Sequence, residues 1–182
     1  MTALLIIDMQ RGLFEGDLPR YDAAGVVNRI NLLSKYFSEK GDKVIFIQHD
    51  GQKGDTFEPF TEAWEILPSL IRRETDLLVR KTACDSFYKT ALQEILHELE
   101  INELVITGCA TDFCVDTTIR SALSKDYDII IVEDGHTTAD REHAKAEVVI
   151  KHHNYVWANL ILPGKEIKVM KMEELLKILS IR

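Results

Sequence analysis

Short apolar runs alternate along the chain with longer segments in which apolar residues recur every three or four positions. The short runs are rich in Leu, Ile and Val and are typical of buried strands, whereas the recurring spacing is typical of amphipathic helices. The pattern predicts strands at residues 3–7, 43–48, 76–80, 103–107, 127–132 and 167–169, and helices at 26–37, 90–99, 112–124, 141–152 and 173–179.

Strands that are apolar on both faces and alternate with helices indicate a parallel sheet covered on each side. The expected fold is α/β, a three-layer α/β/α sandwich with a mostly parallel, Rossmann-like sheet of five to six strands. With 182 residues, the chain is expected to form a single domain over residues 1–182. Residues 50–75 form an irregular stretch that is longer than an ordinary connection, and such stretches often build or cover a binding site.

Composition and charge narrow the range of partners. Hydrophobic residues make up 46% of the chain and charged residues 29%, and the net charge of -8 argues against a nucleic-acid partner, which would need clustered Lys and Arg. No apolar stretch reaches the roughly 20 residues that span a bilayer, and no positively charged leader is present, so we expect no membrane association and a cytoplasmic location. The three cysteines are then expected to be reduced thiols.

Polar residues follow the predicted strands, at the edge where open parallel sheets bind their ligands. Taken strand by strand, they are Asp8, then His49 and Asp50, then Lys81, then Cys109 and Cys114, and finally Glu133, Asp134 and His136. The first strand is not followed by a GxGxxG motif, and the chain contains no GxxxxGK[ST] motif. We therefore expect no dinucleotide or other organic cofactor.

Cys114 falls in the first turn of the helix predicted at 112–124 if Thr111 caps that helix. Free amide groups and the positive end of the helix dipole would stabilise a thiolate there, and the same amides could receive an oxyanion. Lys81 would favour the thiolate electrostatically, and Asp8 could accept the thiol proton and return it to a leaving amine. The sequence thus predicts a nucleophile, a base and a cation at one edge of the sheet.

Three segments carry a family resemblance. LLIIDMQRGLF near the start, LLVRKTACDSFYKTAL in the middle and LVITGCATDFCVDTTIRSAL further on are specific in this order and spacing. With them, the chain resembles the isochorismatase-like cysteine hydrolases, the superfamily that includes nicotinamidases and N-carbamoylsarcosine amidohydrolase. The resemblance runs from about Ala3 to the VEDGHTTADREHAKA segment.

The resemblance implies a three-layer α/β/α fold and a catalytic triad that maps onto Asp8, Lys81 and Cys114. It also implies a cis peptide bond between Cys109 and Ala110 and an oxyanion hole formed by the amides of Ala110 and Cys114. On this interpretation Cys109 packs at the bend between strand and helix and does not react.

Two departures from the family pattern concern the metal and the nucleophile. Nicotinamidases carry a metal site made of an Asp and two His after the second strand, whereas the corresponding stretch here, IQHDGQKGD, has His49 and Asp50 but no second His before His97. We therefore predict no metal and doubt nicotinamide as the substrate. The founding isochorismatases lack the cysteine, so Cys114 places this chain on the amidohydrolase side of the family.

The predicted function is hydrolysis of a small amide, ureide or imide C–N bond through a thioester. The pocket is expected to contain aromatic walls and polar contacts supplied by Gln10, Phe14, His49, Trp64, Asp85, Phe87, Phe113 and His136, although Phe87 and Phe113 could equally be core residues.

Two other classes of function remain open at this point. One is a thiol-redox protein that uses Cys114 with Cys109 as the resolving thiol, although their spacing differs from the CxxC arrangement. The other is a non-catalytic α/β binding module. The expected partners are a small-molecule substrate and further copies of the chain in a homo-oligomer, a dimer or tetramer.

Overall fold

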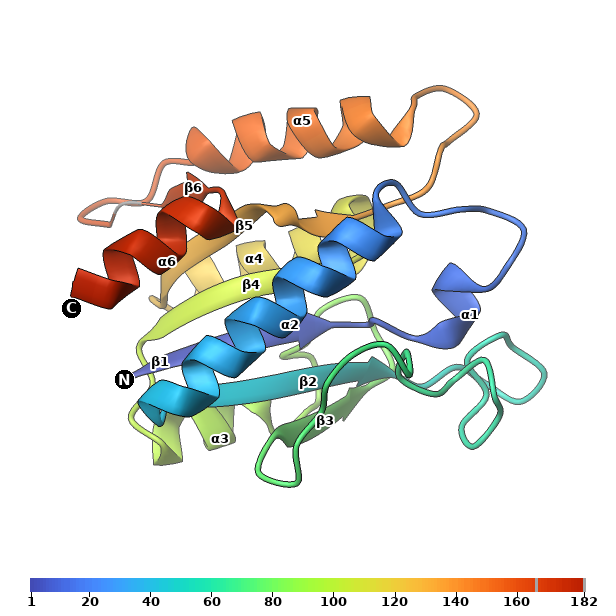
Figure 1. Ribbon diagram of the computed structural model, residues 1–182, viewed down its shortest axis with the longest axis horizontal. Helices are drawn as coiled ribbons and strands as arrows, with labels where there is room; N and C mark the ends of the chain where they lie inside the picture. The colour runs from blue at the N-terminus through green and yellow to red at the C-terminus, as the bar shows by residue number, and fades with distance from the viewer. Residues whose placement is uncertain (166, 182) are drawn as a thin grey trace.

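Helices cover both faces of a central sheet in the computed structural model, which describes residues 1–165 and 167–181 (Figure 1). The expected domain over 1–182 therefore includes two residues, 166 and 182, that lie outside the described residues. The elements are β1 (Thr2–Ile7), α1 (Arg11–Phe14), α2 (Ala23–Lys40), β2 (Lys43–His49), β3 (Leu77–Lys81), α3 (Leu92–Glu98), β4 (Glu103–Cys109), the π-helical turn η1 (Thr111–Val115), α4 (Asp116–Leu123), β5 (Asp128–Thr137), α5 (Ala146–Ala158), β6 (Lys168–Met170) and α6 (Met172–Ile181).

The six strands of the sheet are ordered β3-β2-β1-β4-β5-β6, and every neighbouring pair is parallel. The predicted fold class, a three-layer α/β/α sandwich, is confirmed. Since all strands run the same way, their carboxyl ends meet at one edge of the sheet. That edge receives the residues that follow β1, β2, β3 and β4.

Burial on both faces explains why the strands are continuously apolar. In β1, Leu5 and Ile7 belong to one hydrophobic cluster and Leu4 and Ile6 to the other, because successive side chains point to opposite faces. Buried residues of α3, α4 and α5 complete the first cluster, and those of α2 and α6 complete the second. Figure 1 shows α2 and α6 crossing the near face of the sheet, with α3 and α4 behind it. Among the described residues, no helix combines the length and apolar character needed to cross a membrane.

Several helix boundaries differ from those predicted, and two of the differences bear on the carboxyl edge of the sheet. The segment expected as one helix at 112–124 consists of η1 followed by α4, and α5 begins at Ala146 instead of residue 141. The backbone N–H of Ala146 donates to Asp140 Oδ1 (2.9 Å), so this carboxylate, which lies before the helix, satisfies a free N–H group of its first turn. The residues between β5 and α5 are therefore not helical, and they lie at the carboxyl edge of the sheet.

Gly108 occupies the point where β4 passes closest to β1. Its φ is +127°, and a Cβ added there would lie 2.2 Å from the backbone oxygen of Ile7. Both the backbone conformation and the space therefore require glycine, two residues from the peptide bond that precedes η1.

Replacing Gly108 with alanine is expected to lower the free energy of unfolding by about 2–5 kcal/mol, because a strained φ and a backbone clash combine. Urea unfolding followed by circular dichroism measures this loss. Gly41→Ala is the matched control, since Gly41 also has a positive φ (+79°) but nothing within 4 Å of the added Cβ. It should lose only about 1 kcal/mol. Equal losses in the two variants would show that the contact with Ile7 is unimportant.

Candidate active site

Asp8 and Lys81 come together at the carboxyl edge of the sheet from strands that are not neighbours. Asp8 follows β1 and Lys81 ends β3, with β2 between them. The Lys81 ammonium lies 2.6 Å from Asp8 Oδ2. Asp8 has a φ of 48°, a left-handed conformation that Asp adopts more readily than most residues. Its backbone N–H donates to Ile47 (2.9 Å), which fixes the turn after β1.

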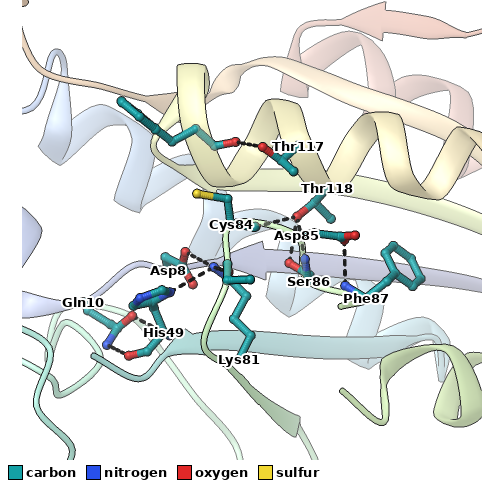
Figure 2. A network of polar contacts seen from close by, with 12 residues as sticks. Asp8, Gln10, His49, Lys81, Cys84, Asp85, Ser86, Phe87, Thr117 and Thr118 are labelled. Carbon is teal, nitrogen blue, oxygen red and sulfur yellow. Dashed lines mark hydrogen bonds and ion pairs between the residues drawn. The ribbon is translucent and has the colours of Figure 1, made fainter. Parts of the chain in front are cut away.

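Lys81 is an unusually buried lysine, with 2% of its surface exposed. Its ammonium donates to the carbonyl of Ala83 (2.9 Å) and lies 3.4 Å from His49 Nδ1. Figure 2 shows the Lys81 side chain reaching up past the end of β2 toward Asp8 and His49. A buried lysine needs such partners, because an unpaired charge away from water is costly. The carboxylate, the carbonyl and the imidazole together compensate this cation.

Cys114 enters the same site from η1, which follows β4. The peptide bond between Cys109 and Ala110 is cis, as the family resemblance implies. Ala110, and not Thr111 as expected, occupies the N-cap position, and Thr111 is the first residue of the turn, with Oγ1 bonded to His136 Nδ1 (2.9 Å). Cys114 therefore does lie in the first turn, where amide N–H groups lack regular intrahelical partners.

Burial and mutual attraction set the charges of the pair. Burial raises the pKa of Asp8 above its ordinary value, although the charge of Lys81 and a hydrogen bond from Cys114 act in the opposite direction. For Lys81, burial lowers the pKa, but the negative charge of Asp8 and the interaction with Cys114 outweigh it, so the net shift is upward. Lys81 is thus a permanent cation beside a carboxylate of increased basicity.

The surroundings of the Cys114 thiol act against the thiolate that the sequence suggests. Burial, followed by the charge of Asp8, raises the pKa of the Cys114 thiol above its ordinary value, and the opposing effect of Lys81 is smaller. This direction favours the neutral thiol, with the Asp8 carboxylate beside it at the same cavity. The sequence reveals the helix dipole and the nearby cation but does not reveal how deeply the sulfur is buried. In this arrangement the carboxylate is placed to take the proton when the sulfur reacts.

His49 and Asp50, for which the sequence predicts no metal, have protein partners. Burial, followed by the charge of Lys81, lowers the pKa of His49, so its imidazole is neutral. Asp50 accepts hydrogen bonds from Trp64 Nε1 (2.8 Å) and Arg80 Nε (3.0 Å). Within residues 1–165 and 167–181, no group of three or more His, Cys, Asp or Glu side chains is placed to hold a metal ion.

A cavity of about 310 Å³ opens over Asp8 and Cys114. This volume is at the small end of the range for ligand sites. Its lining is partly apolar and partly charged, and consists of Asp8, Gln10, Leu13, Arg20, His49, Phe57, Cys84, Cys109, Ala110, Phe113, Cys114 and Arg141. Of the residues predicted for the pocket, Gln10, His49 and Phe113 are present.

Five residues predicted for the pocket are absent from its lining, namely Phe14, Trp64, Asp85, Phe87 and His136. Phe14 lies beside α2, where it lines a separate surface groove. Trp64 carries the carbonyl that accepts a hydrogen bond from Gln10 Nε2 (2.8 Å), while its indole is bonded to Asp50. It therefore holds the loop after β2 against the sheet.

The other three absent residues support the structure around the site. Phe87 is buried and stacks on Tyr127, with ring centroids 5.8 Å apart, so it is a core residue. Asp85 accepts the backbone N–H of Phe87 (2.8 Å) within the turn, and Figure 2 places both on the side away from Asp8. His136 is buried and anchors the start of η1 through Thr111, and burial lowers its pKa to about 4.

Five residues that line the cavity were not among the site residues predicted from the sequence: Leu13, Arg20, Phe57, Cys84 and Arg141. Phe57 belongs to the irregular stretch 50–75, whose length already suggests a binding site. Arg141 was expected to lie in a helix, but it precedes α5 and donates to Asp112 from Nε (2.8 Å) and Nη2 (2.9 Å). Arg20 lies far from any strand end in the sequence and gave no signal.

The two remaining cysteines differ in their surroundings. Cys109 is fully buried, and burial raises the pKa of its thiol to about 12. Such a thiol is a poor nucleophile for disulfide exchange, so a resolving role for Cys109 has little support. Cys84 is exposed at the cavity, and all three cysteines are free thiols.

Comparison with known proteins identifies the family of the chain. The isochorismatase domain profile matches residues 2–156, most of the chain. The chain belongs to the isochorismatase family. This isochorismatase-family chain is 31% identical to a streptothricin hydrolase of Streptomyces noursei over 140 residues, which are 77% of this chain and 51% of that protein. The chain thus spans about half the length of that relative.

Solved structures of the isochorismatase family share the fold. A crystal structure of an isochorismatase family protein superposes with a TM-score of 0.83 at 32% identity, covering 92% of this chain and 96% of the other. The N-carbamoylsarcosine amidase of Thermoplasma acidophilum superposes with a TM-score of 0.77 at 23% identity, covering 94% and 96%. At that lower identity the likeness concerns the fold alone.

Proposed function

We propose that this protein is a cysteine hydrolase that cleaves the C–N bond of a small amide, ureide or imide through a thioester. The observation that carries the proposal is the convergence of three groups: Asp8 and Cys114 line one cavity, and Lys81 is paired with Asp8 behind it. Membership of the isochorismatase family, in which a streptothricin hydrolase is a named relative, supports it. A nucleophile, a base and a cation in mutual contact are what acyl transfer to a thiol requires.

In the first half of the reaction, the Cys114 sulfur attacks the substrate carbonyl while its proton passes to the Asp8 carboxylate. The raised pKa of Asp8 favours this transfer, because a more basic carboxylate takes the proton more readily. The carbonyl oxygen becomes an oxyanion, for which the amides of Ala110 and Cys114 are the proposed donors. Lys81 stabilises the negative charge of Asp8 and interacts with the Cys114 sulfur before the proton moves.

In the second half, protonated Asp8 gives its proton to the leaving nitrogen, the C–N bond breaks, and ammonia or an amine departs. The acyl group remains on the sulfur as a thioester. Asp8, again a carboxylate, accepts a proton from water, whose oxygen attacks the thioester. The carboxylic acid leaves as the C–S bond breaks, and the proton returns to the Cys114 sulfur. The net reaction consumes one water for each C–N bond.

An ammonia-release screen over small amides, ureides and imides tests the proposal with the full-length protein. We expect turnover for at least one class, together with a burst of amine when enzyme and substrate are mixed at comparable concentrations. Mass spectrometry of the quenched reaction should find the acyl group on Cys114. Turnover without any acyl adduct, even at early times, would contradict the thioester.

The pH profile of this activity should have its acid limb above the usual titration range of a carboxyl group. Asp8 must be ionised to act as the base, and its pKa is raised, so kcat/KM should fall as the pH drops through a value above about 4. The raised pKa of Lys81 implies no loss of the cation up to about pH 10. Initial rates between pH 4 and 10 give the profile, and a kcat/KM that stays constant down to pH 4 would exclude Asp8 as the base.

A further inference from the structure

Arg20 is a cavity residue whose charge no carboxylate of the described residues balances. We propose that Arg20 binds a carboxylate of the substrate, so that the substrates are small amides or ureides that carry an anionic group. This inference rests on the proposed function, because it assigns the substrate class of the same site. It concerns a residue that lies outside the three family motifs, six residues after the end of the first.

The guanidinium of Arg20 has almost no partners. Arg20 is half-buried, yet within residues 1–165 and 167–181 it forms no ion pair with any carboxylate. Its Nε is buried without a hydrogen-bond partner, and its single hydrogen bond runs from Nη1 to the carbonyl of Leu18 at 3.4 Å, which is long for such a bond. A buried donor without a partner carries a free-energy cost, which a ligand could remove.

The other charged groups of the cavity are already paired. Asp8 is paired with Lys81, and Arg141 with Asp112. Burial raises the pKa of Asp112, but hydrogen bonds from Arg141 and Thr138 outweigh it and keep the pKa below its ordinary value. His49 contributes no charge, since its pKa is lowered. The cavity therefore carries an excess of one positive charge, supplied by Arg20, in a chain whose net charge is -8.

The backbone of Arg20 is fixed against the end of the sheet. Arg20 forms an isolated antiparallel bridge with Ala139, and the adjacent Tyr21 donates its N–H to the carbonyl of Thr138 (2.9 Å). Thr137 Oγ1 donates in turn to the carbonyl of Tyr21 (2.6 Å). A cation that is held in place before the ligand arrives loses little freedom on binding, so this arrangement suits recognition better than an arginine on a free loop.

A planar guanidinium with free N–H groups matches a carboxylate, which can accept two of its hydrogen bonds at once. The aromatic rings of Phe57 and Phe113 and the side chain of Leu13 complete the lining with apolar surface. The cavity of about 310 Å³ has room for a short substrate whose carbonyl lies at Cys114 and whose anionic end lies at Arg20.

The test compares each acid with its uncharged ester. Succinamate and glutaramate, and the methyl ester of each, are assayed for ammonia release with the wild-type protein and with Arg20→Gln, Arg20→Lys and Arg72→Gln. We expect the wild type to prefer the acids by roughly tenfold or more in kcat/KM, and Arg20→Gln to lower the value for the acids by roughly 10- to 100-fold with little change for the esters. The kcat/KM of Arg20→Lys for the acids should lie between those of the wild type and Arg20→Gln, since lysine keeps the charge but not the paired N–H donors of the guanidinium.

Arg72→Gln is the matched control, because Arg72 is exposed and lies over the ring of Phe46, outside the cavity. It should retain the wild-type preference. Calorimetric titration of the same four compounds into Cys114→Ser and Cys114→Ser/Arg20→Gln measures binding without turnover. The acids should bind more tightly than the esters, and only when Arg20 is present.

The two readouts separate the inference from the proposed function. Arg20-dependent binding of the acids without ammonia release from any amide would overturn the hydrolase function and support the anion site. Turnover in which acid and ester are equivalent, or in which Arg20→Gln keeps the preference, would overturn the anion site and leave the hydrolase intact. If the acids show no binding and no turnover, the inference is overturned.

Discussion

Cys114→Ser is expected to lower kcat/KM for the best amide substrate by at least about 10³-fold, because a hydroxyl is far less acidic than a thiol and the site gives it no stronger base than Asp8. The burial that already raises the pKa of the thiol would act on the hydroxyl as well. Ammonia release under single-turnover and steady-state conditions measures the loss. Circular dichroism and urea unfolding establish that the variant is folded, which is expected because sulfur and oxygen differ little in size.

Cys84→Ser is the matched control for this experiment, since Cys84 is a free and exposed thiol at the same cavity. It should lose less than about tenfold, because an exposed cysteine at the cavity wall takes no part in the proposed thioester. If both serine variants lose activity to the same extent, the nucleophile has been assigned to the wrong cysteine. If Cys114→Ser keeps more than about a tenth of the activity, the thioester mechanism fails.

Lys81→Met should have the second largest effect, with kcat lowered by about 10²–10³-fold and stability lowered as well. Without the cation, the buried Asp8 would titrate at a still higher pKa and would be protonated, and so useless as a base, over much of the working range. Breaking a buried pair by removing one partner costs about 3–5 kcal/mol. Activity assays and urea unfolding at pH 5 and pH 8 measure the two losses.

The sign of the pH dependence identifies the cause of the lost stability. A carboxyl whose pKa is raised in the folded state favours folding below its unfolded pKa and loses that contribution as the pH rises through the folded value. Lys81→Met should therefore be less stable at pH 8 than at pH 5, relative to the wild type. The double variant Asp8→Asn/Lys81→Met removes both charges and should recover most of the stability while remaining inactive. A double variant as unstable as Lys81→Met would indicate that packing, and not charge, accounts for the loss.

The strands and the carboxyl edge could be predicted from the sequence because they depend on local pattern. Apolar runs such as 3–7 appear as β1, with its two faces buried in separate clusters, and polar residues that directly follow strands lie at one edge. Asp8, Lys81 and Cys114 were found by that rule and by the family motifs. The start of α5 was predicted too early, because the role of Asp140 before the helix depends on a turn that the periodicity does not encode.

The walls of the cavity could not be predicted, because they depend on which loops meet in space. Phe87 and Phe113 have the same residue type and both lie near strand ends, yet Phe87 packs on Tyr127 in the core and Phe113 is half exposed at the cavity beneath Arg141. Arg20 belongs to the connection before α2 and reaches the site only because its backbone pairs with Ala139. The protonation of Cys114 was also beyond sequence reasoning, since burial decides it.

The position of β3 ties the chemistry of this protein to the integrity of its sheet. β3 is an edge strand with a single neighbour, β2, and edge strands are expected to unfold locally before the strands between them. The contact between Lys81 and Asp8 crosses over β2 and fastens the end of β3 to the central strand β1. Substitutions at this pair are therefore expected to weaken the anchoring of the edge strand together with the chemistry.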